Sequence, residues 1–386
     1  MKALKTILVK DSSVLEYDVI LTNKIFDIEN KTIKNYCYGK KILVVLSETV
    51  NKLYSKYVIE YFEYNFKQQY KIIVIPTTEY NKNIESVSNI CKAGKEFCLD
   101  RNSLMVAIGG GILLDMVGFS ASMYKRRMDY IKIPTTLLGQ IDAGIGIKTG
   151  VNFEDSKNFL GSYHPPIATI NDIKLLETLQ KKEVLFGLAE IIKMAIVKDS
   201  ILFELIESNS QSLIKYNFQE KNDIPHKINE RSILRMLEEL TGNFLEHNLE
   251  RLVDFGHTFS PFIEGFTNYK VSHGAAVALD IAISTELNYI KNGISKIDRD
   301  RILNLILDIG LQIYDEKTFI PDLMWESLQN ILLHRGMNLN LVVPINIGEA
   351  TFIKNIKEIS PQLLNQTFTS LNKIQSLFYE KEVVMV

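Results

Sequence analysis

Two histidines mark the stretch of this chain with the greatest potential for chemistry. His257 and His273 lie sixteen residues apart, each has a glycine beside it, and each stands at the edge of an apolar helical pattern. Imidazole is the commonest metal ligand in proteins. Because two histidines alone are more often structural than metal-binding, the metal interpretation depends on a third ligand.

Glu190 is the candidate third ligand. It stands in a strongly apolar helical run from 188 to 196, with Lys193 three residues later on the same helix face. A surface ion pair is the alternative, but the apolar neighbours leave little solvent-facing arc. A buried glutamate needs a partner, and a cation is one candidate. Glu190, His257 and His273 would form a site with two histidines, one carboxylate and an open position, which is the ligand set of a catalytic zinc.

A glycine run suggests a phosphate-binding turn. Gly109, Gly110 and Gly111 directly follow a predicted strand, and Asp115 stands in the helix predicted after them. Glycines let backbone amides approach a pyrophosphate, and a helix N-terminus stabilises its charge. The pattern is not G-x-G-x-x-G and follows the third strand of the series, so a tight turn is the alternative.

Polar residues follow the next predicted strand. Thr135 and Thr136 stand at its carboxyl end, where α/β sheets bind ligands. A long run punctuated by glycines comes next and contains Asp142, Lys148 and the pair Lys157-Asn158. Long loops inside compact domains are more often functional than decorative.

The elements that position these residues divide the chain into two parts. Residues 4–28 alternate apolar and polar side chains, which predicts strands of a partly exposed sheet or hairpin. Strands are then predicted at 41–46, 71–75, 104–108 and 130–133, with helices at 50–66, 83–99 and 113–123. This alternation indicates a parallel sheet covered on both faces.

Helical patterns dominate from residue 172 onward. They occupy 173–216, 230–244, 274–292, 296–308 and 322–333, with a polar loop at 217–229 and one late strand at 339–343. The expected fold class is α/β plus all-α. Residues 1–171 are predicted to be a Rossmann-like NAD-binding domain, and residues 172–386 a helical domain that binds metal and substrate.

Bulk properties exclude several classes of protein. The net charge of -2 favours neither nucleic acid nor membrane, and Lys125-Arg126-Arg127 is too short for a nucleic-acid patch. No apolar run approaches the ~18 residues of a membrane span. Three cysteines without metal-type spacing indicate a reducing compartment, so we expect a cytoplasmic protein.

Taken together and in order, these motifs resemble the dehydroquinate synthase superfamily, the sugar phosphate cyclases. The resemblance covers roughly residues 40–345. It rests on the glycine run with Asp115, Pro134-Thr-Thr, Asp142, Lys148-Thr, Lys157-Asn158, Ala189-Glu-x2-Lys193, Phe255-Gly-His257 and His273-Gly. Each piece is weak alone, and the set is specific.

The resemblance implies an active site in the cleft between the two domains of a homodimer, with NAD and a divalent metal, usually zinc and alternatively cobalt. It implies Glu190, His257 and His273 as metal ligands. By the same resemblance, NAD contacts would come from Glu79, Lys82, Gly109, Gly110, Gly111, Asp115, Thr135, Thr136, Asp142 and Lys148. The residues that hold or act on the substrate would be Arg126, which reaches a phosphate across the dimer interface, with Asp142, Lys148, Lys157, Asn158, Lys193, Asp254 and His334.

Four positions depart from dehydroquinate synthases themselves. Those enzymes carry a second histidine where this chain has Pro261, Asn at Asp254, Arg at Glu250, and Lys near His334. The Arg, Asn and Lys positions suit a substrate carboxylate. A carboxylate ~4 Å from one ionised aspartate would be repelled by about 4 kcal/mol at an effective dielectric of 20. The exchange therefore argues for a substrate with a neutral ketose end.

Asp254, Ser260-Pro261 and His334-Arg-Gly look most like the 2-epi-5-epi-valiolone synthases. That resemblance implies NAD- and metal-dependent cyclisation of sedoheptulose 7-phosphate to a C7 cyclitol with loss of phosphate, by transient oxidation, elimination, re-reduction and intramolecular aldol reaction. The alternatives are a 3-dehydroquinate synthase and a related cyclase that gives 2-epi-valiolone or desmethyl-4-deoxygadusol. An NAD-dependent polyol dehydrogenase and a catalytically inactive NAD-binding regulator are further alternatives.

Overall fold

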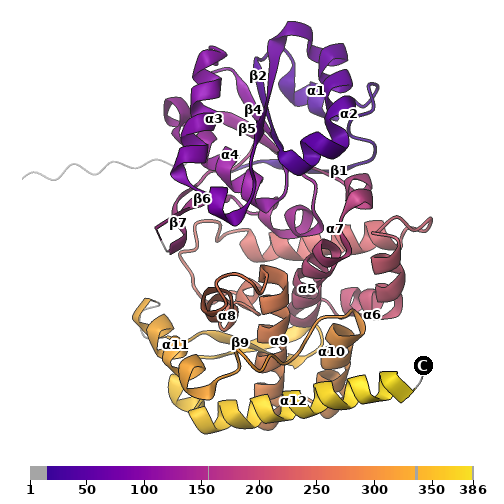
Figure 1. Cartoon of the computed structure of the whole chain (residues 1–386), viewed down its shortest axis with the longest axis vertical. Helices are drawn as coiled ribbons and strands as arrows, with labels where there is room; N and C mark the ends of the chain where they lie inside the picture. The colour runs from indigo at the N-terminus through magenta and orange to yellow at the C-terminus, as the bar shows by residue number, and fades with distance from the viewer. Residues whose placement is uncertain (1–14, 155, 335–337, 385–386) are drawn as a thin grey trace, which may run out of the picture.

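The protein has two halves, stacked along its longest axis. A computed structural model describes residues 15–154, 156–334 and 338–384. One half is a sheet with helices on either side, and the other is built around α9 (His273–Ile290), with α12 (Pro361–Val384) running along the far end (Figure 1). The predicted fold class, an α/β half followed by a mainly helical half, is confirmed.

The first half contains a six-stranded sheet in the order β1-β8-β5-β4-β2-β3, with every pair parallel. The central strands β2 and β4 are buried throughout, since helices cover both of their faces. The strands are β1 (Asp18–Thr22), β2 (Ile42–Ser47), β3 (Tyr70–Ile75), β4 (Leu104–Gly109), β5 (Asp129–Pro134) and β8 (Ala168–Asp172).

Alternate residues of the central strands point into two separate cores. Ile42 and Val44 pack with α1 (Thr32–Cys37) and α2 (Glu48–Phe66) on one face. Leu43 and Val45 pack with α3 (Ile84–Glu96) and α4 (Gly111–Met123) on the other. The prediction that helices cover both faces of the sheet is confirmed.

The strand predicted in the partly exposed region of residues 4–28 is present as β1, an edge strand that pairs parallel with β8, while residues 4–14 lie outside the described part of the chain. Two other predictions from the sequence need correction. The glycine-punctuated run is not a loop, because it forms the antiparallel hairpin of β6 (Lys148–Phe153) and β7 (Ser156–Tyr163). The loop predicted at 217–229 is shorter, since α7 (Ile224–Leu240) begins inside it with Pro225 in its first turn, where proline is tolerated.

The second half packs its helices around α9. Its remaining elements are α5 (Lys181–Lys198), α6 (Ser200–Lys215), α8 (Ser260–Phe266), α10 (Lys296–Asp308), α11 (Pro321–His334), and the hairpin of β9 (Leu341–Asn346) and β10 (Glu349–Ile353). Leu137, Ile141 and Ile145, from the segment after β5, belong to the same hydrophobic core as these helices. Because this segment before residue 171 shares the core of the second half, the domain boundary at residue 171 remains a prediction.

In the described part of the chain, no helix has both the length and the apolar character that a membrane span requires.

Glycine allows α5 and α9 to approach each other closely. A Cβ placed on Gly274, the second residue of α9, would lie 2.8 Å from the carbonyl oxygen of Phe186 on α5 and would also clash with its Cα. The obstacle is backbone, which cannot move without shifting a helix. Because Glu190 lies on α5 and His273 begins α9, this contact sets how near those two side chains can come.

We expect Gly274→Ala to destabilise the protein by about 1–3 kcal/mol, the cost of overpacking a tight core contact. Urea denaturation monitored by circular dichroism measures this change. Gly265→Ala is the matched control, since a Cβ at Gly265 would have no neighbour within 4 Å. Equal stabilities for the two variants would contradict the close α5–α9 contact.

Candidate active site

Glu190, His257 and His273 meet at one point, although they come from α5, the segment before α8, and the start of α9. One possible ligand atom from each lies within 4.8 Å of the others. The Nε2 atoms of His257 and His273 lie 3.5 and 3.2 Å from Oε1 of Glu190. The structure thus brings together the three residues that the sequence suggested as metal ligands.

Hydrogen bonds at the opposite ring nitrogens orient both imidazoles. Nδ1 of His257 lies 3.0 Å from the carbonyl oxygen of Phe255, and Nδ1 of His273 lies 2.9 Å from Oε1 of Glu264. Both partners are acceptors, so each Nδ1 carries the hydrogen and each Nε2 is directed at Glu190. This is the arrangement that metal-binding histidines adopt.

The Glu190 carboxylate suits a cation. It is fully buried, and neither of its oxygens has a hydrogen bond of favourable geometry with a described residue, although Nζ of Lys193 lies 2.5 Å from Oε2. A buried carboxylate without hydrogen bonds is costly unless a positive charge faces it. The donor set of two imidazoles and one carboxylate fits a zinc or cobalt ion.

The charges around the three candidate ligands are compatible with a bound cation. Burial opposes charge on Lys193, but the carboxylates of Glu190 and Asp142 raise its pKa. Burial also opposes charge on His273, yet the carboxylates of Glu190 and Glu264 beside it raise its pKa to about 10. In contrast, burial and the charge of Lys193 lower the pKa of His257 to about 4. A metal ion that binds here displaces the proton of His273.

The glycine run lies at a switch point of the sheet. From β2 the chain moves outward to β3, and β4 then pairs on the other side of β2, so the loops after β2 and β4 diverge. Gly110 is the N-cap of α4, and no side chain caps this helix. Thr135 and Thr136 lie alongside, since the Thr135 amide donates to the Gly109 carbonyl and the Thr136 methyl would lie 3.2 Å from a Cβ on Gly110. This uncapped helix start suits a pyrophosphate.

Three predicted residues form one polar cluster beside α4. Nζ of Lys82, which is buried, lies 2.6 Å from Oδ2 of Asp115 and 2.5 Å from Oδ1 of Asn158. Glu79 accepts a hydrogen bond of 2.8 Å from the side chain of Asn152 on β6. The cluster ties the β6–β7 hairpin to the edge of the sheet where a dinucleotide is expected.

The hairpin also reaches the helical half. Nζ of Lys157 lies 2.7 Å from Oε2 of Glu264, the carboxylate that holds His273. Lys148 pairs with Glu246, which also pairs with Arg251. In this structure both lysines therefore contact carboxylates of the other half.

Asp254 and Glu250 do not present unpaired negative charges. Oδ2 of Asp254 accepts a hydrogen bond of 3.1 Å from Nε of Arg251, and Oε1 of Glu250 lies 2.7 Å from Nζ of Lys354 in an exposed ion pair. The repulsion calculated for an isolated aspartate is therefore too large, because Arg251 offsets the charge of Asp254. These ion pairs weaken the electrostatic argument against a carboxylated substrate.

The structure does not connect the remaining predicted residues to the cluster. Arg126 is exposed, and the described residues offer it no ion pair. Pro261 lies in the first turn of α8. His334 is the last residue of α11, and its side chain lies outside the described part of the chain, as do Arg335 and Gly336.

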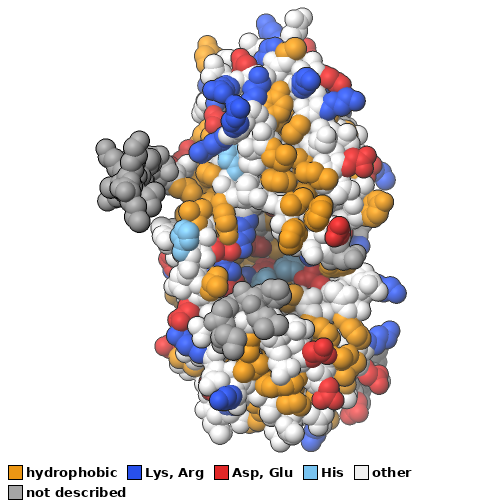
Figure 2. Space-filling view, turned by 90° about the vertical axis from the view of Figure 1, so that its left-hand side faces the viewer, with side chains coloured by type: hydrophobic (Ala, Val, Ile, Leu, Met, Phe, Trp, Pro, Cys, Tyr) orange, Lys and Arg blue, Asp and Glu red, His pale blue; other side chains and the backbone are white. Residues whose placement is uncertain are grey.

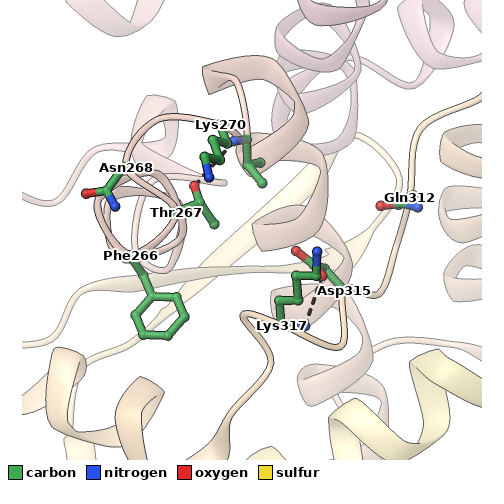
Figure 3. Close-up of a pocket in the computed structure, with 8 residues that line it drawn as sticks. Phe266, Thr267, Asn268, Lys270, Gln312, Asp315 and Lys317 are labelled. Atoms are coloured by element: carbon green, nitrogen blue, oxygen red, sulfur yellow. Dashed lines mark hydrogen bonds between the residues drawn. The ribbon is translucent and has the colours of Figure 1, made fainter.

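The surface is hollowed between the two halves, and histidine, acidic and basic side chains gather in the hollow (Figure 2). A separate pocket of about 520 Å³ lies between the end of α8 and residues 312–317 (Figure 3). Its polar lining includes Thr267, Lys270, Asp315 and Lys317, but none of the three clustered candidate ligands. The candidate site is therefore the hollow between the halves.

Sequence reasoning missed several residues of this site. Glu264 and Asp280 each interrupt an apolar helical run, and that was a usable signal because a buried carboxylate needs partners. Arg251 stands three residues before Asp254, the spacing of a local ion pair. Glu246 lies in a polar segment and carries no such signal.

The chain matches two family descriptions over most of its length. Residues 72–185 match the family described as 3-dehydroquinate synthase N-terminal, and residues 187–333 match 3-dehydroquinate synthase C-terminal. The two matches meet between β8 and the middle of α5, so the family covers both halves of the site.

Curated relatives and a solved structure agree with this match. The chain is 38% identical to a 2-epi-5-epi-valiolone synthase from Streptomyces glaucescens over 92% of this chain and 91% of the relative. It is 33% identical to a demethyl-4-deoxygadusol synthase from Trichormus variabilis, over 89% and 85% of the two chains. The structure of ValA, a 2-epi-5-epi-valiolone synthase from Streptomyces hygroscopicus subsp. jinggangensis with NAD+ and Zn2+ bound, superposes with a TM-score of 0.88 at 34% identity, covering 95% of this chain and 99% of that one.

We expect Glu264→Gln to lower the affinity for Zn2+ by about 10–100-fold, because the amide is a weaker partner for Nδ1 of His273. Competition with a chromophoric chelator measures this affinity. Lys157→Met is the matched control, since it removes the other partner of Glu264 and leaves the hydrogen bond to His273. If Glu264→Gln binds Zn2+ as tightly as the unaltered protein, Glu264 does not orient a metal ligand.

Proposed function

We propose that this chain, which belongs to the 3-dehydroquinate synthase family, cyclises sedoheptulose 7-phosphate to 2-epi-5-epi-valiolone with loss of phosphate. The reaction would combine transient oxidation, elimination, re-reduction and an intramolecular aldol step, which makes the protein a carbon–oxygen lyase. The observation that carries the proposal is the buried Glu190 carboxylate, faced by two imidazole Nε2 atoms and by Lys193. The likeness to 2-epi-5-epi-valiolone synthases across both halves supports the choice of substrate.

Two groups would complete the site. Glu190, His257 and His273 would hold Zn2+ or Co2+, and the start of α4, with Thr135 and Thr136, would hold NAD beside the cluster of Glu79, Lys82 and Asp115. When bound, the metal would lower the pKa of a substrate hydroxyl, and NAD+ would accept a hydride and return it.

The charged residues beside the metal ligands would orient the sugar. Lys193 and Asp142 lie close enough to alter each other's pKa, so together they can donate to and accept from neighbouring substrate hydroxyls. Asp254, held by Arg251, would accept hydrogen bonds from hydroxyls of the ketose end. His334 would act at the same end.

The β6–β7 hairpin would bind the phosphate. Lys148, Lys157 and Asn158 lie on this hairpin, and their present partners are Glu246, Glu264 and Lys82. A phosphate carries more charge than a carboxylate, so it can replace Glu246 at Lys148. Because the β6–β7 hairpin contacts both halves of the protein, phosphate binding would draw the two halves together.

We also propose a homodimer in the cytoplasm. Arg126 is exposed and would reach the phosphate of the neighbouring subunit, which gives the Lys125-Arg126-Arg127 run a role. The backbone of Arg126 has φ of 71°, a conformation that a residue with a side chain seldom adopts without a local constraint. The free cysteines Cys37, Cys91 and Cys98 suit a reducing compartment.

The substrate is tested by incubating the protein with NAD+, Zn2+ and sedoheptulose 7-phosphate. We expect phosphate release with no net growth of absorbance at 340 nm, and a product that NMR identifies as 2-epi-5-epi-valiolone. The parallel incubation uses the carboxylated heptulosonate phosphate that dehydroquinate synthases cyclise. Rapid turnover of that compound, with sedoheptulose 7-phosphate inert, would make the protein a 3-dehydroquinate synthase. Formation of 2-epi-valiolone or desmethyl-4-deoxygadusol would instead identify the related cyclase, and accumulation of NADH a dehydrogenase.

His257→Ala removes one of the three proposed metal ligands. We expect bound Zn2+ and activity to fall together, each by more than about 100-fold, because losing a ligand costs more than losing one of its hydrogen-bonding partners. Metal analysis of the purified variant and phosphate release measure the two losses. His247→Ala is the control, since among the described residues this histidine does not belong to the cluster of possible metal ligands. Full activity of His257→Ala without bound metal would disprove the ligand set.

A further inference from the structure

A carboxylate from α9 holds the chain that follows His257. Oδ2 of Asp280 accepts hydrogen bonds from three successive backbone amides, those of Thr258 at 2.8 Å, Phe259 at 2.5 Å and Ser260 at 2.8 Å. These are the first three residues after the candidate ligand. One oxygen atom therefore fixes the direction in which the chain leaves His257.

The rest of the Asp280 side chain is also bonded. Oδ1 accepts a hydrogen bond of 3.1 Å from the hydroxyl of Ser284, one turn further along α9. Asp280 is 0% exposed. Burial raises its pKa to about 6, against the effect of these donors. An acidic side chain at such a position is expensive, and a neutral apolar residue would fill the space without that cost.

Asp280 lies on the same helix as the candidate ligand His273. His273 is the first residue of α9, and Asp280 follows seven residues later, about two helical turns along the same rigid element. The helix α9 therefore carries His273 and, through Asp280, also holds the segment that follows His257.

Packing also holds the segment around His257 against α9. Gly256, just before His257, has φ of +73°, and a Cβ there would lie 3.0 Å from Val277 on α9. The hydroxyl of Ser260 donates back to the Gly256 carbonyl at 2.7 Å. The segment from 256 to 260 is therefore closed on itself and pressed against the helix on both sides of His257.

We propose that Asp280 is a positioning residue that sets the separation of the His257 and His273 imidazoles before a metal ion binds. The inference rests on the proposed function only in that these two rings are metal ligands. It assigns Asp280 no contact with metal, cofactor or substrate. Its effect is preorganisation, since the free ligand set already has the spacing that the bound ion requires.

The test compares Zn2+ affinity in Asp280→Asn and in the unaltered protein by competition with a chromophoric chelator. The neutral amide is a weaker acceptor for three amides, so the segment loosens, and we expect the affinity to fall by about 10–100-fold. The visible spectrum of bound Co2+ should change as well, because it reports the ligand geometry. Ser284→Ala is the matched control, since it removes the Oδ1 partner and leaves the bonds to residues 258–260, and it should retain the unaltered affinity and spectrum.

A second measurement covers the case in which Asp280→Asn does not fold. In the unaltered, metal-free protein, the amides of Thr258, Phe259 and Ser260 should exchange with deuterium at least about 100-fold more slowly than an unstructured chain. Unaltered Zn2+ affinity and Co2+ spectrum in Asp280→Asn, or rapid exchange of these amides, would overturn the proposal. Neither readout uses a sugar phosphate, so an error in the proposed substrate leaves both intact. A protein that binds no metal at all would refute the proposed function rather than the role of Asp280 in holding the segment.

Discussion

The negative charge of Glu190 constrains everything built around it. It lies on α5, a helix buried along most of its length, where a carboxylate without a cation would be unstable. Lys193, one turn further along, supplies a single positive charge, while Asp142 adds a second negative charge nearby. His257 stays neutral, while His273 holds a proton that balances this excess of negative charge in the metal-free site. A divalent cation that displaces this proton replaces one positive charge with two.

This requirement explains why distant packing contacts matter. The carboxylate can meet both imidazoles only if α5 and α9 lie close together, and the glycine at 274 permits that approach. The ring of His273 keeps its orientation through Glu264, and the ring of His257 through the backbone at Phe255. Helix packing, the backbone at Phe255 and the Glu264 carboxylate together therefore determine where the side chains of Glu190, His257 and His273 lie.

How much of this could be predicted from the sequence depended on the range of each interaction. The strands and helices of residues 41–133 were predictable because each buried strand is a short apolar run and each helix repeats with its own period. The β6–β7 hairpin was not, since glycines and polar residues interrupt its few apolar residues and neither period is visible. The three candidate ligands could be found because histidine is rare in this chain and Glu190 interrupts an apolar helical run. The ion pairs of Glu246 with Lys148 and of Glu250 with Lys354 could not be found, because a pair between separate segments leaves no spacing to read. The charge of Asp254 was misjudged although Arg251 stands only three residues before it.

The ion pairs of the hollow have a consequence for the order of binding. Lys148, Lys157, Lys193, Arg251 and the protonated His273 give five positive charges, and Asp142, Glu190, Glu246, Asp254 and Glu264 give five negative ones, so these residues carry no net charge without a metal. A divalent cation that displaces the proton of His273 raises the net charge to +1. At an effective dielectric of 20, each unit of charge changes the interaction of a neighbouring group by a few kcal/mol. A filled metal site therefore favours the phosphate electrostatically, and by reciprocity a bound phosphate holds the metal more tightly.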